Sequence, residues 1–527
     1  MTVTDPATRA TVLEDAWLAA ATEGFRCLGS GAADPVKVLL EITDPAPGAP
    51  GRVLMAMDLD TGRLGFTRAG RQDRAALTVV LTRDDAVTLL LGDGRARVRL
   101  FETGRVRMHG VFLFVFFLDR LLLQDPSGTV ARLRAAAGVV AEPSAGLPVH
   151  VPLPPAGEPE PSAGLPRTVE LLRAETLRTS PGVQLYVSHR GTPVIDAGLG
   201  SARPAVPMRA DALPIWYCCA KTVSAVAVGR LWERELLDPY APVADVLPWY
   251  SGGGRERVRL VDILTHTSPV PMGADPLHGC MSAPWDLRRG AVARMPVPDG
   301  PNGERINYAA WWGWFVIAEM IEALTGRTYV EYLETEVLGP CGMDRSKVVF
   351  DGAGYDAAGA TLPLIYVAGG ALPPQPTWWF STEGAATTVI PGLNIRGPMR
   401  DLGRLFEMLV RRGQGRSGRV LRPVTVAALT GRHRVGLEPD QLGNADWSLG
   451  FRLESRHLGE RCCAFGRSAS LRTFGHYGLW TTVVFADPDH DLVVALHLNG
   501  KTMQDEHQRR VLGICDAIYA DLGLARG

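Results

Sequence analysis

The sequence predicts an α/β protein built from two domains. Its length of 527 residues exceeds what one ordinary hydrophobic core organises. Residues 141–167 are rich in Pro, Gly, Ser and Glu and contain the heptapeptide EPSAGLP twice, a composition that favours extended backbone over a packed core. Strand and helix patterns alternate on both sides of this stretch. We therefore expect domains at 1–140 and 168–527, joined by a linker at 141–167.

The overall composition is that of a soluble globular protein. Hydrophobic residues make up 46% of the chain and charged residues 21%. The formal net charge of −1 gives no electrostatic case for nucleic acid or an anionic membrane as a partner. The eight cysteines have no regular spacing, and no cysteine–histidine cluster has zinc-site spacing. We expect neither a disulfide framework nor a metal or cofactor.

The N-terminus and the most apolar run indicate the compartment. Residues 1–17 carry acidic side chains and lack an apolar stretch, unlike a secretory signal. The apolar run at 111–117 is followed by Asp119 and Arg120 and is too short to span a bilayer. We expect a cytoplasmic protein whose thiols stay reduced.

The first domain has strand patterns between helical segments. Helices are expected at about 7–28, 84–91 and 112–123, and strands at 36–43, 53–58, 64–67, 77–81 and 104–110. The segment ALTVVLTRDDAVTLLLGDG followed by GRVRMHGVFLFVFFLDRLL resembles the sterol-carrier-protein domain, an α/β lipid-binding fold, within about residues 34–133. The resemblance implies a pocket for a lipid or acyl chain. A docking domain with a filled core is the alternative.

In the second domain, a helix beginning at about Cys218 carries the first chemically informative motif. Two predicted strands, 183–189 and 194–199, precede it. Cys218 and Lys221 are three residues apart and so share one helix face. The helix N-terminus and the ammonium group both favour a thiolate, which makes a cysteine reactive near neutral pH. Only four of the 55 basic residues are lysines, so Lys221 is unusual, although a cysteine on a core helix is commonly just a small apolar residue.

Further motifs follow in order along the second domain. They are LDPYAPVADVLP (237–248), ILTHTS (263–268), LGPCGM (338–343), MRDLGRL (399–405) and FGHYG (474–478). Together with the Cys218 motif they resemble the β-lactamase and penicillin-binding-protein superfamily, especially its class C β-lactamase and esterase branch. The resemblance extends from about residue 166 to 522. It implies an antiparallel sheet flanked by helices, with a helical insert.

The resemblance assigns roles to individual residues. In the superfamily a serine attacks a carbonyl carbon while a lysine and a tyrosine move protons. Cys218 takes the place of that serine, Lys221 of the lysine and Tyr308 of the tyrosine. His476 takes the place of a lysine or histidine close to the substrate and to the tyrosine oxygen. The implied oxyanion hole consists of the N–H groups of Cys218 and Leu479.

One departure from the superfamily pattern affects the pocket. Ala310 replaces the Asn of a Tyr-x-Asn motif, which removes an amide that would hold substrate. Trp311, Trp312 and Trp314 follow, and either one of them lines the pocket or they belong to the helix core. The expected substrate-binding positions are Ala310, Trp311, Tyr477 and Gly478.

The second departure, cysteine in place of serine, changes the expected product. An acylated Cys218 is a thioester, which amines attack far more readily, relative to water, than they attack an oxygen ester. Aromatic residues in place of the Asn also help to exclude water. The sequence therefore predicts an acyltransferase that moves an acyl group from a small-molecule activated ester to an amine, similar to the amide-forming transacylases of antibiotic biosynthesis in this superfamily. A hydrolase using the same residues and a non-catalytic ligand-binding homologue are the alternatives.

Other candidate residues have structural explanations. Cys219 lies about 100° round the helix from Cys218 and should point elsewhere. Cys462 and Cys463 adjoin the last strands and fit packing better than redox chemistry. His266 is expected to hydrogen-bond a turn. Residues 487–491 (DPDHD) fit a hairpin loop, with a metal site as the remote alternative.

Overall fold

The computed structural model describes most of residues 12–110 and 164–525. Between these stretches it describes only residues 133, 135 and 136. Within them the gaps are 23–35, 46, 58–63, 74, 76, 93–99, 101–106, 272–274, 278–282, 301, 304, 370–371, 378–379, 381–382 and 436–445. The chain forms two compact units: residues 1–150 with 276–289 and 370–379, and the remainder. The predicted linker lies outside the described residues except for 164–167.

The first unit contains a five-stranded mixed sheet. Its strands, in the order β3-β2-β1-β4-β5, pair antiparallel except for β1 and β4, which are parallel. Thr82 accepts a hydrogen bond from the Asp85 N–H and so caps helix α3, which follows β4. The elements are α2 (Asp15–Thr22), β1 (Val36–Ile42), β2 (Arg52–Met57), β3 (Leu64–Arg68), β4 (Leu77–Leu81), α3 (Arg83–Leu91) and β5 (Arg107–Gly110).

The predicted strands of this unit are confirmed to within a few residues, and so is the helix expected at 84–91. Trp17 of α2 packs on Phe66 of β3, with ring centroids 5.4 Å apart. The apolar helix expected at 112–123 lies outside the described residues. The sterol-carrier resemblance and its lipid pocket therefore stay predictions.

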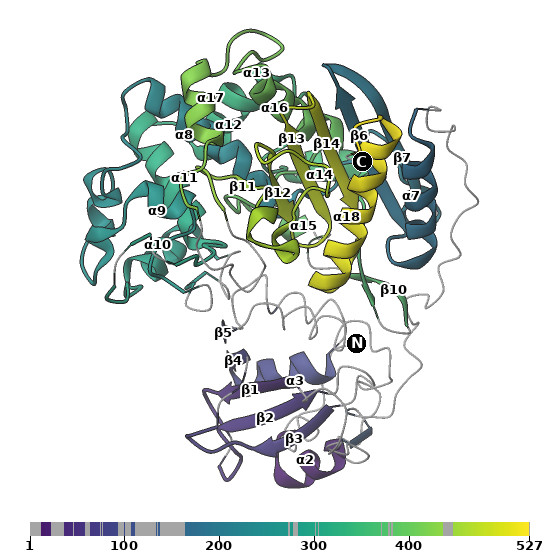
Figure 1. Ribbon diagram of the computed structural model, residues 1–527. Coiled ribbons are helices and arrows are strands. Elements are labelled where there is room, and N and C mark those ends of the chain that lie inside the picture. The colour runs from purple at the N-terminus through teal and green to yellow at the C-terminus, as the bar shows by residue number, and fades with distance from the viewer. Residues whose placement is uncertain are drawn as a thin grey trace. The chain divides into compact units, whose positions relative to one another are not determined.

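The second unit is organised around a seven-stranded antiparallel sheet in the order β11-β12-β13-β14-β6-β7-β8. Helices α7 and α18 cover one face, and α16 packs on the other (Figure 1). The strands are β6 (Gly182–His189), β7 (Thr192–Arg203), β8 (Val206–Pro207), β11 (Arg452–Leu453), β12 (Phe474–Gly478), β13 (Thr482–Asp487) and β14 (Leu492–Leu498), and the covering helices are α7 (Pro166–Arg178), α16 (Met399–Val410) and α18 (Gln504–Asp521).

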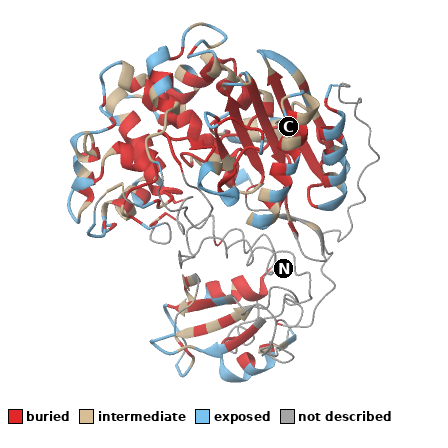
Figure 2. Cartoon of the chain, in the orientation of Figure 1, coloured by how far each residue is buried: buried red, intermediate tan, exposed pale blue. Residues whose placement is uncertain are grey.

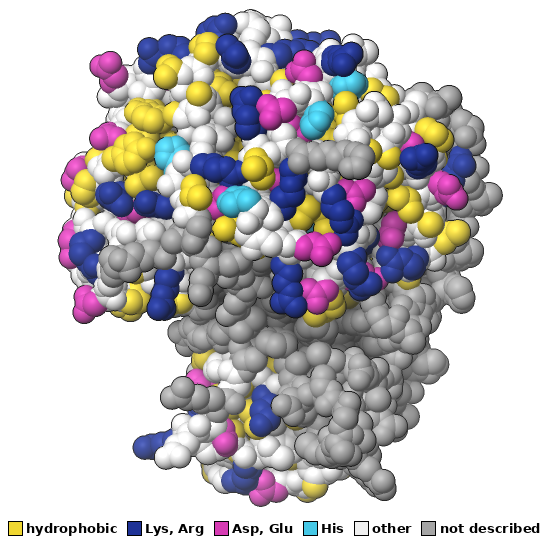
Figure 3. All heavy atoms as spheres, in the orientation of Figure 1, with side chains coloured by type: hydrophobic (Ala, Val, Ile, Leu, Met, Phe, Trp, Pro, Cys, Tyr) yellow, Lys and Arg dark blue, Asp and Glu magenta, His cyan; other side chains and the backbone are white. Residues whose placement is uncertain are grey.

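Burial of both sheet faces explains the apolar sequence of the central strands. Every residue of β14 is buried, and so is every residue of β6 except its last. Figure 2 shows buried residues filling the sheet, while exposed residues occupy the outer sides of the covering helices. Lys and Arg side chains are interspersed with Asp and Glu over the drawn face of this unit (Figure 3).

A helical region completes the second unit. Its central helix, α8, buries ten of its thirteen residues, which accounts for a nearly unbroken run of small and apolar side chains. The helices and strands of this unit outside the main sheet are α8 (Lys221–Glu233), α9 (Leu260–Leu264), α11 (Trp312–Thr325), α12 (Tyr329–Leu333), α13 (Gly339–Cys341), α14 (Gly352–Ala358), β9 (Ile365–Gly369), α15 (Glu383–Thr387), α17 (Pro423–Thr430) and β15 (Gly500–Lys501). Strand β10 (Leu372–Thr377) and residues 285–289 of α10 (Trp285–Ala293) are assigned to the first unit.

The α/β class and the antiparallel, helix-flanked second unit are confirmed, with two local corrections. The α-helix begins at Lys221, and Cys218 lies in a preceding 3-10 turn, Tyr217–Ala220. The β6–β7 turn falls at Arg190 and Gly191, whose φ angles are +51° and +72°, and β7 begins at Thr192, two residues before the predicted strand. The hairpin loop predicted at 487–491 is present between β13 and β14. Among the described residues, no helix is long and apolar enough to cross a membrane.

Two helical glycines provide a test of the packing of α16 against the sheet. A Cβ atom on Gly403 of α16 would lie 2.4 Å from the Tyr186 ring of β6, whereas one on Gly513 of α18 would meet nothing within 4 Å. Gly403→Ala should therefore lower the melting temperature, because the helix must move off the sheet. Gly513→Ala should raise it, since alanine is worth about 1 kcal/mol more than glycine inside a helix. Thermal unfolding of both variants by circular dichroism measures this, and equal shifts would contradict the packing described.

Candidate active site

Cys218 lies where the chain enters the central helix. The preceding residue, Tyr217, has a φ of +49°, a left-handed conformation that is uncommon for a bulky side chain. Its buried ring holds this conformation by packing edge-on against Phe380, with centroids 4.9 Å apart. Cys218 itself is half-buried, whereas Cys219 is fully buried. The turn thus presents one thiol toward the site and hides the next.

Lys221 is a fully buried amine beside Cys218. Its Nζ donates hydrogen bonds to the carbonyl oxygens of Ala310 (3.1 Å) and Gly392 (3.0 Å). It also lies 5.5 Å and 5.4 Å from the ring centroids of Tyr308 and Trp314, in cation–π range. Burial lowers the pKa of Lys221, and its attraction to the Cys218 sulfur opposes that shift. An ammonium with a lowered pKa exchanges its proton more readily near neutral pH.

The Tyr308 loop is held by two long-range contacts. The Asp275 carboxylate accepts hydrogen bonds from the N–H groups of Trp311 (2.9 Å) and Trp312 (3.1 Å) and so caps helix α11. The His266 Nδ1 accepts from the Ala309 N–H at 3.1 Å, and its ring lies 4.3 Å from the Tyr308 ring. These contacts fix Tyr308 beside the Lys221 ammonium.

His476 on β12 completes the group. Its Nδ1 lies 2.8 Å from the Tyr477 carbonyl, and a carbonyl can only accept, so Nδ1 carries the proton and Nε2 the lone pair. Nε2 has no hydrogen-bond partner among the described residues. Burial, with the nearby Lys221 charge, lowers the pKa of His476 to about 3. The imidazole is therefore neutral near pH 7, where its Nε2 can accept a hydrogen bond but supplies no positive charge.

The structure brings the four predicted catalytic residues together. The Tyr308 and His476 rings lie 6.4 Å apart, and both residues interact with Lys221, as does the Cys218 sulfur. Trp447, which sequence reasoning did not select, lies 5.7 Å from the His476 ring and 6.0 Å from the Tyr308 ring. The site is thus largely aromatic.

The end of β12 is pressed against the Cys218 turn. A Cβ atom on Gly478 would lie 2.3 Å from the Trp216 carbonyl oxygen, so only glycine fits there. Leu479 and Trp480 form the following turn with φ angles of +41° and +56°. Bulky residues in this conformation cost about 1–2 kcal/mol each. The predicted oxyanion donor, the Leu479 N–H, therefore belongs to a strained turn beside the cysteine.

The predicted substrate-binding positions differ in where they lie. Ala310 supplies a carbonyl to Lys221 rather than a side-chain contact. Trp311, Trp312 and Trp314 are all buried, and Trp314 borders Lys221. The Tyr477 hydroxyl bonds to the Ala464 carbonyl within the core on the opposite face of β12. Any contact of Tyr477 with substrate would come from its backbone.

Cys219, Cys462, Cys463 and His266 have the structural surroundings that the sequence predicts. The Cys219 sulfur points to the His476 carbonyl at 3.4 Å, away from the site. Cys462 and Cys463 are buried free thiols, and His266 bonds a loop N–H. Within the described residues, no cluster of His, Cys, Asp or Glu could hold a metal ion. The carbonyl of Gly392 and the Asp275 cap escaped prediction because a backbone contact and a long-range cap leave no local sequence pattern.

An antiparallel sheet with a lysine, a tyrosine and a histidine gathered beside a helix-entry turn is the architecture of the β-lactamase-like α/β proteins. Residues 173–515 match the family model described as Beta-lactamase, and the chain belongs to that family. This confirms the superfamily resemblance of the second domain.

The related proteins found by sequence comparison are distant in sequence. The chain is 26% identical over 344 residues to the esterase/β-lactamase LipL of Mycobacterium tuberculosis (strain ATCC 25618 / H37Rv), an alignment that covers 60% of this chain and 76% of LipL. It is 28% identical over 188 residues to a D-aminopeptidase of Brucella anthropi, covering 33% of this chain and 34% of that protein.

Solved structures show the same fold. A penicillin-binding-protein homologue from Caulobacter crescentus superposes with a TM-score of 0.54 at 21% identity, covering 68% of this chain and 98% of that one. EstCE1, described as a hydrolase with promiscuous acyltransferase activity, gives a TM-score of 0.57 at 19% identity with the same coverage. At these identities the likeness defines the fold alone.

The exposure of the thiols predicts which cysteine reacts first. Cys218 is half-buried, whereas the other five described cysteines are buried and burial raises their pKa values, that of Cys341 to about 12. Iodoacetamide near pH 7.5 should therefore alkylate Cys218 before those five. Peptide mapping over time measures the rates. Lys221→Met should slow the Cys218 reaction, and equal rates at a buried cysteine would contradict the prediction.

Proposed function

We propose that this protein transfers an acyl group from an activated ester to an amine through a thioester on Cys218. The observation that carries the proposal is the buried Lys221 ammonium, which interacts with the Cys218 sulfur while it is held by two carbonyls and two aromatic faces. A lysine fixed this firmly beside a half-buried thiol is suited to take up and return a proton. A lysine with only a structural role would not require a thiol beside it.

Acylation would begin from the thiolate–ammonium pair that forms when the Cys218 proton passes to the neutral Lys221 amine, with Tyr308 assisting the transfer. The thiolate attacks the ester carbonyl carbon, forming a carbon–sulfur bond, and the developing oxyanion is held by the N–H groups of Cys218 and Leu479. The carbon–oxygen bond of the ester then breaks. The leaving alkoxide or phenoxide receives its proton from Tyr308, which recovers one from Lys221.

Transfer would follow when an amine attacks the thioester. The amine nitrogen forms the amide bond, the carbon–sulfur bond breaks and the Cys218 thiolate is regenerated. The proton that the attacking amine must lose passes through Tyr308 to Lys221, which acylation has left neutral, and the Nε2 lone pair of the neutral His476 can accept a hydrogen bond from the amine. The aromatic surroundings of Tyr308, Trp314 and Trp447 favour a site with little water.

Hydrolysis is the second candidate function. The family membership and the names of LipL and the D-aminopeptidase favour it. The same residues would act, with water in place of the amine. EstCE1 is described as a hydrolase with promiscuous acyltransferase activity, so one protein of this fold supports both kinds of reaction.

The substrates, the cellular compartment and the role of the first unit are also proposals. We propose that the acyl donor and the amine are small molecules, as in antibiotic biosynthesis, and that the protein acts in the cytoplasm. We also propose that the first unit binds a lipid or acyl chain, on the basis of its resemblance to the sterol-carrier domain.

Removing the proton relay should slow acylation. Tyr308→Phe keeps the ring beside Lys221 but lacks the hydroxyl, so the rate of acylation by an activated ester should fall by about 10²–10⁴. Lys221→Ala should reduce the rate at least as much, because it also removes the charge beside the thiolate. Stopped-flow release of p-nitrophenol from p-nitrophenyl acetate measures both. Wild-type rates in either variant would show that these residues do not move protons.

The choice between transfer and hydrolysis depends on the sulfur atom. Cys218→Ser changes little volume, so the variant should fold, and its acyl-enzyme is an oxygen ester. It should give a lower ratio of amide to acid product than the wild type at one fixed amine concentration. Cys218→Ala should give neither product.

Chromatographic quantification of both products decides the matter. A wild type that yields mostly acid, or a serine variant that forms amide equally selectively, would favour the hydrolase function instead. A wild type that is never acylated would indicate a ligand-binding protein.

A further inference from the structure

The hairpin turn that contains the Leu479 N–H, one of the two expected oxyanion donors, has a backbone conformation that is unfavourable without contacts from outside the turn. Gly478, Leu479, Trp480 and Thr481 form a tight hairpin turn in which the Thr481 N–H donates to the Gly478 carbonyl at 2.9 Å. Both central residues have positive φ angles, a geometry for which Asn-Gly is the usual sequence. Leucine and tryptophan hold it only if surrounding contacts impose it.

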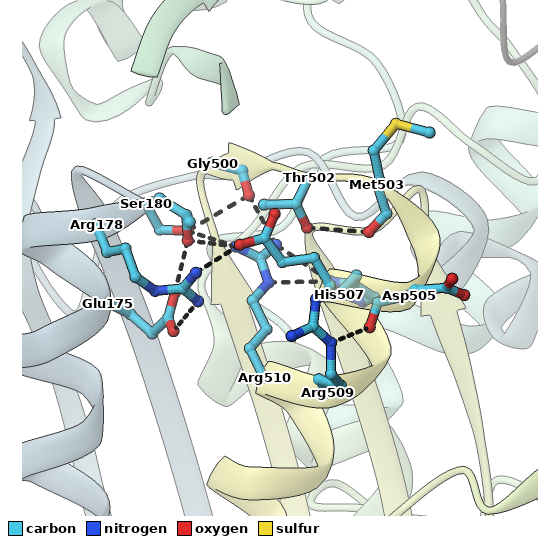
Figure 4. Close-up of polar contacts among 12 residues, drawn as sticks. Glu175, Arg178, Ser180, Gly500, Thr502, Met503, Asp505, His507, Arg509 and Arg510 are labelled. Carbon is cyan, nitrogen blue, oxygen red and sulfur yellow. Dashed lines mark hydrogen bonds and ion pairs between the residues drawn. The ribbon is translucent and has the colours of Figure 1, made fainter. Parts of the chain in front are cut away.

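Arg510 on α18 supplies such a contact. Its side chain is buried, and one terminal nitrogen donates to the carbonyl oxygens of Trp480 and Gly500, each at 2.7 Å. Figure 4 shows the guanidinium of Arg510 reaching between Ser180, Gly500 and His507. The Lys501 ammonium additionally lies 5.7 Å from the Trp480 ring centroid. The turn is therefore fixed both through its backbone and through its side chain.

The remaining donors of Arg510 are occupied by neutral groups. The second terminal nitrogen donates to the hydroxyls of Thr179 (3.0 Å) and Ser180 (2.9 Å), and Nε donates to the His507 Nδ1 (3.3 Å). The Thr179 hydroxyl donates in turn to the Glu175 carboxylate at 2.6 Å. Burial lowers the pKa of Arg510 to about 10, so it stays charged near neutral pH. A buried charge satisfied in this way contributes little to stability compared with an apolar side chain, which indicates a geometric role.

The hairpin turn at Leu479 and Trp480 follows directly after Gly478, which contacts the Cys218 turn. Gly478 lies against the Trp216 carbonyl and the Tyr217 Cβ, so the two segments are in contact. Leu479 follows Gly478 and precedes Trp480, whose carbonyl Arg510 holds. A relaxed turn would move the Leu479 N–H relative to the Cys218 N–H while leaving the thiol and Lys221 in place.

We propose that Arg510 is a positioning residue that holds the Leu479–Trp480 turn in its left-handed conformation and thereby aims the Leu479 N–H at the oxyanion. The inference rests on the proposed acyl transfer through Cys218. It predicts a selective defect, because attack on an ester carbonyl develops an oxyanion whereas alkylation by iodoacetamide does not.

The test compares two reactions of the same thiol in the full-length chain. Acylation is followed by the burst of p-nitrophenol from p-nitrophenyl acetate, and alkylation by the rate of iodoacetamide labelling at Cys218. Arg510→Met should slow acylation by about 10²-fold, the effect of losing one oxyanion donor, with the alkylation rate unchanged. Arg510→Lys, which keeps a charged donor, should slow it less. The matched control is Arg509→Met, because Arg509 is exposed on the same helix and should alter neither rate.

Each outcome decides the matter. Wild-type acylation rates in Arg510→Met, or a parallel fall of both rates, would overturn the positioning role, the second by showing a general structural effect. If Arg510→Met does not fold, Arg510→Lys gives the deciding comparison by the same two rates. A wild type that alkylates at Cys218 but is never acylated would overturn the proposed function, and the positioning role with it.

Discussion

Burial of the Lys221 ammonium is the constraint on which the geometry of the site depends. A charge removed from water must be satisfied by nearby groups, and here those groups come from two separate parts of the chain, residues 308–314 and Gly392. The carbonyls of Ala310 and Gly392 accept its hydrogen bonds, and the rings of Tyr308 and Trp314 face it. Satisfying this one charge therefore brings the Tyr308 loop and the start of α8 into a single arrangement.

Two turns with a strained backbone belong to the same site as this lysine. Tyr217, Leu479 and Trp480 all have positive φ angles. Tyr217 precedes Cys218, and Leu479 and Trp480 form the second turn, so the strain lies at or next to the two N–H groups expected to bind an oxyanion. Such conformations persist only where packing imposes them. Phe380 packs against Tyr217, and Arg510 holds the second turn from the far side of the sheet. The rigid sheet and its covering helices thus fix a locally unfavourable site.

The sequence predicts the fold and the candidate site best where a residue pattern repeats along a strand or where several motifs follow one another in a fixed order. Strand alternation predicts the central strands, and the ordered motifs select Cys218, Lys221, Tyr308 and His476, which lie together in the structure. Periodicity could not show that Cys218 lies in a 3-10 turn, because both helix types place residues three apart close together. Strand alternation places the side chains of Tyr477 and His476 on opposite faces of β12, whereas motif matching alone assigns both residues to the site. Contacts through backbone carbonyls leave no trace in residue identity.

The central claim is that Cys218 carries the acyl group as a thioester. Intact-protein mass spectrometry after brief exposure to p-nitrophenyl acetate and an acid quench tests it most directly. The wild type should gain one acetyl group, located on the Cys218 peptide and removed by neutral hydroxylamine, and Cys218→Ala should gain none. A wild type of unchanged mass, or a Cys218→Ala variant that gains the same acetyl group, would contradict the account.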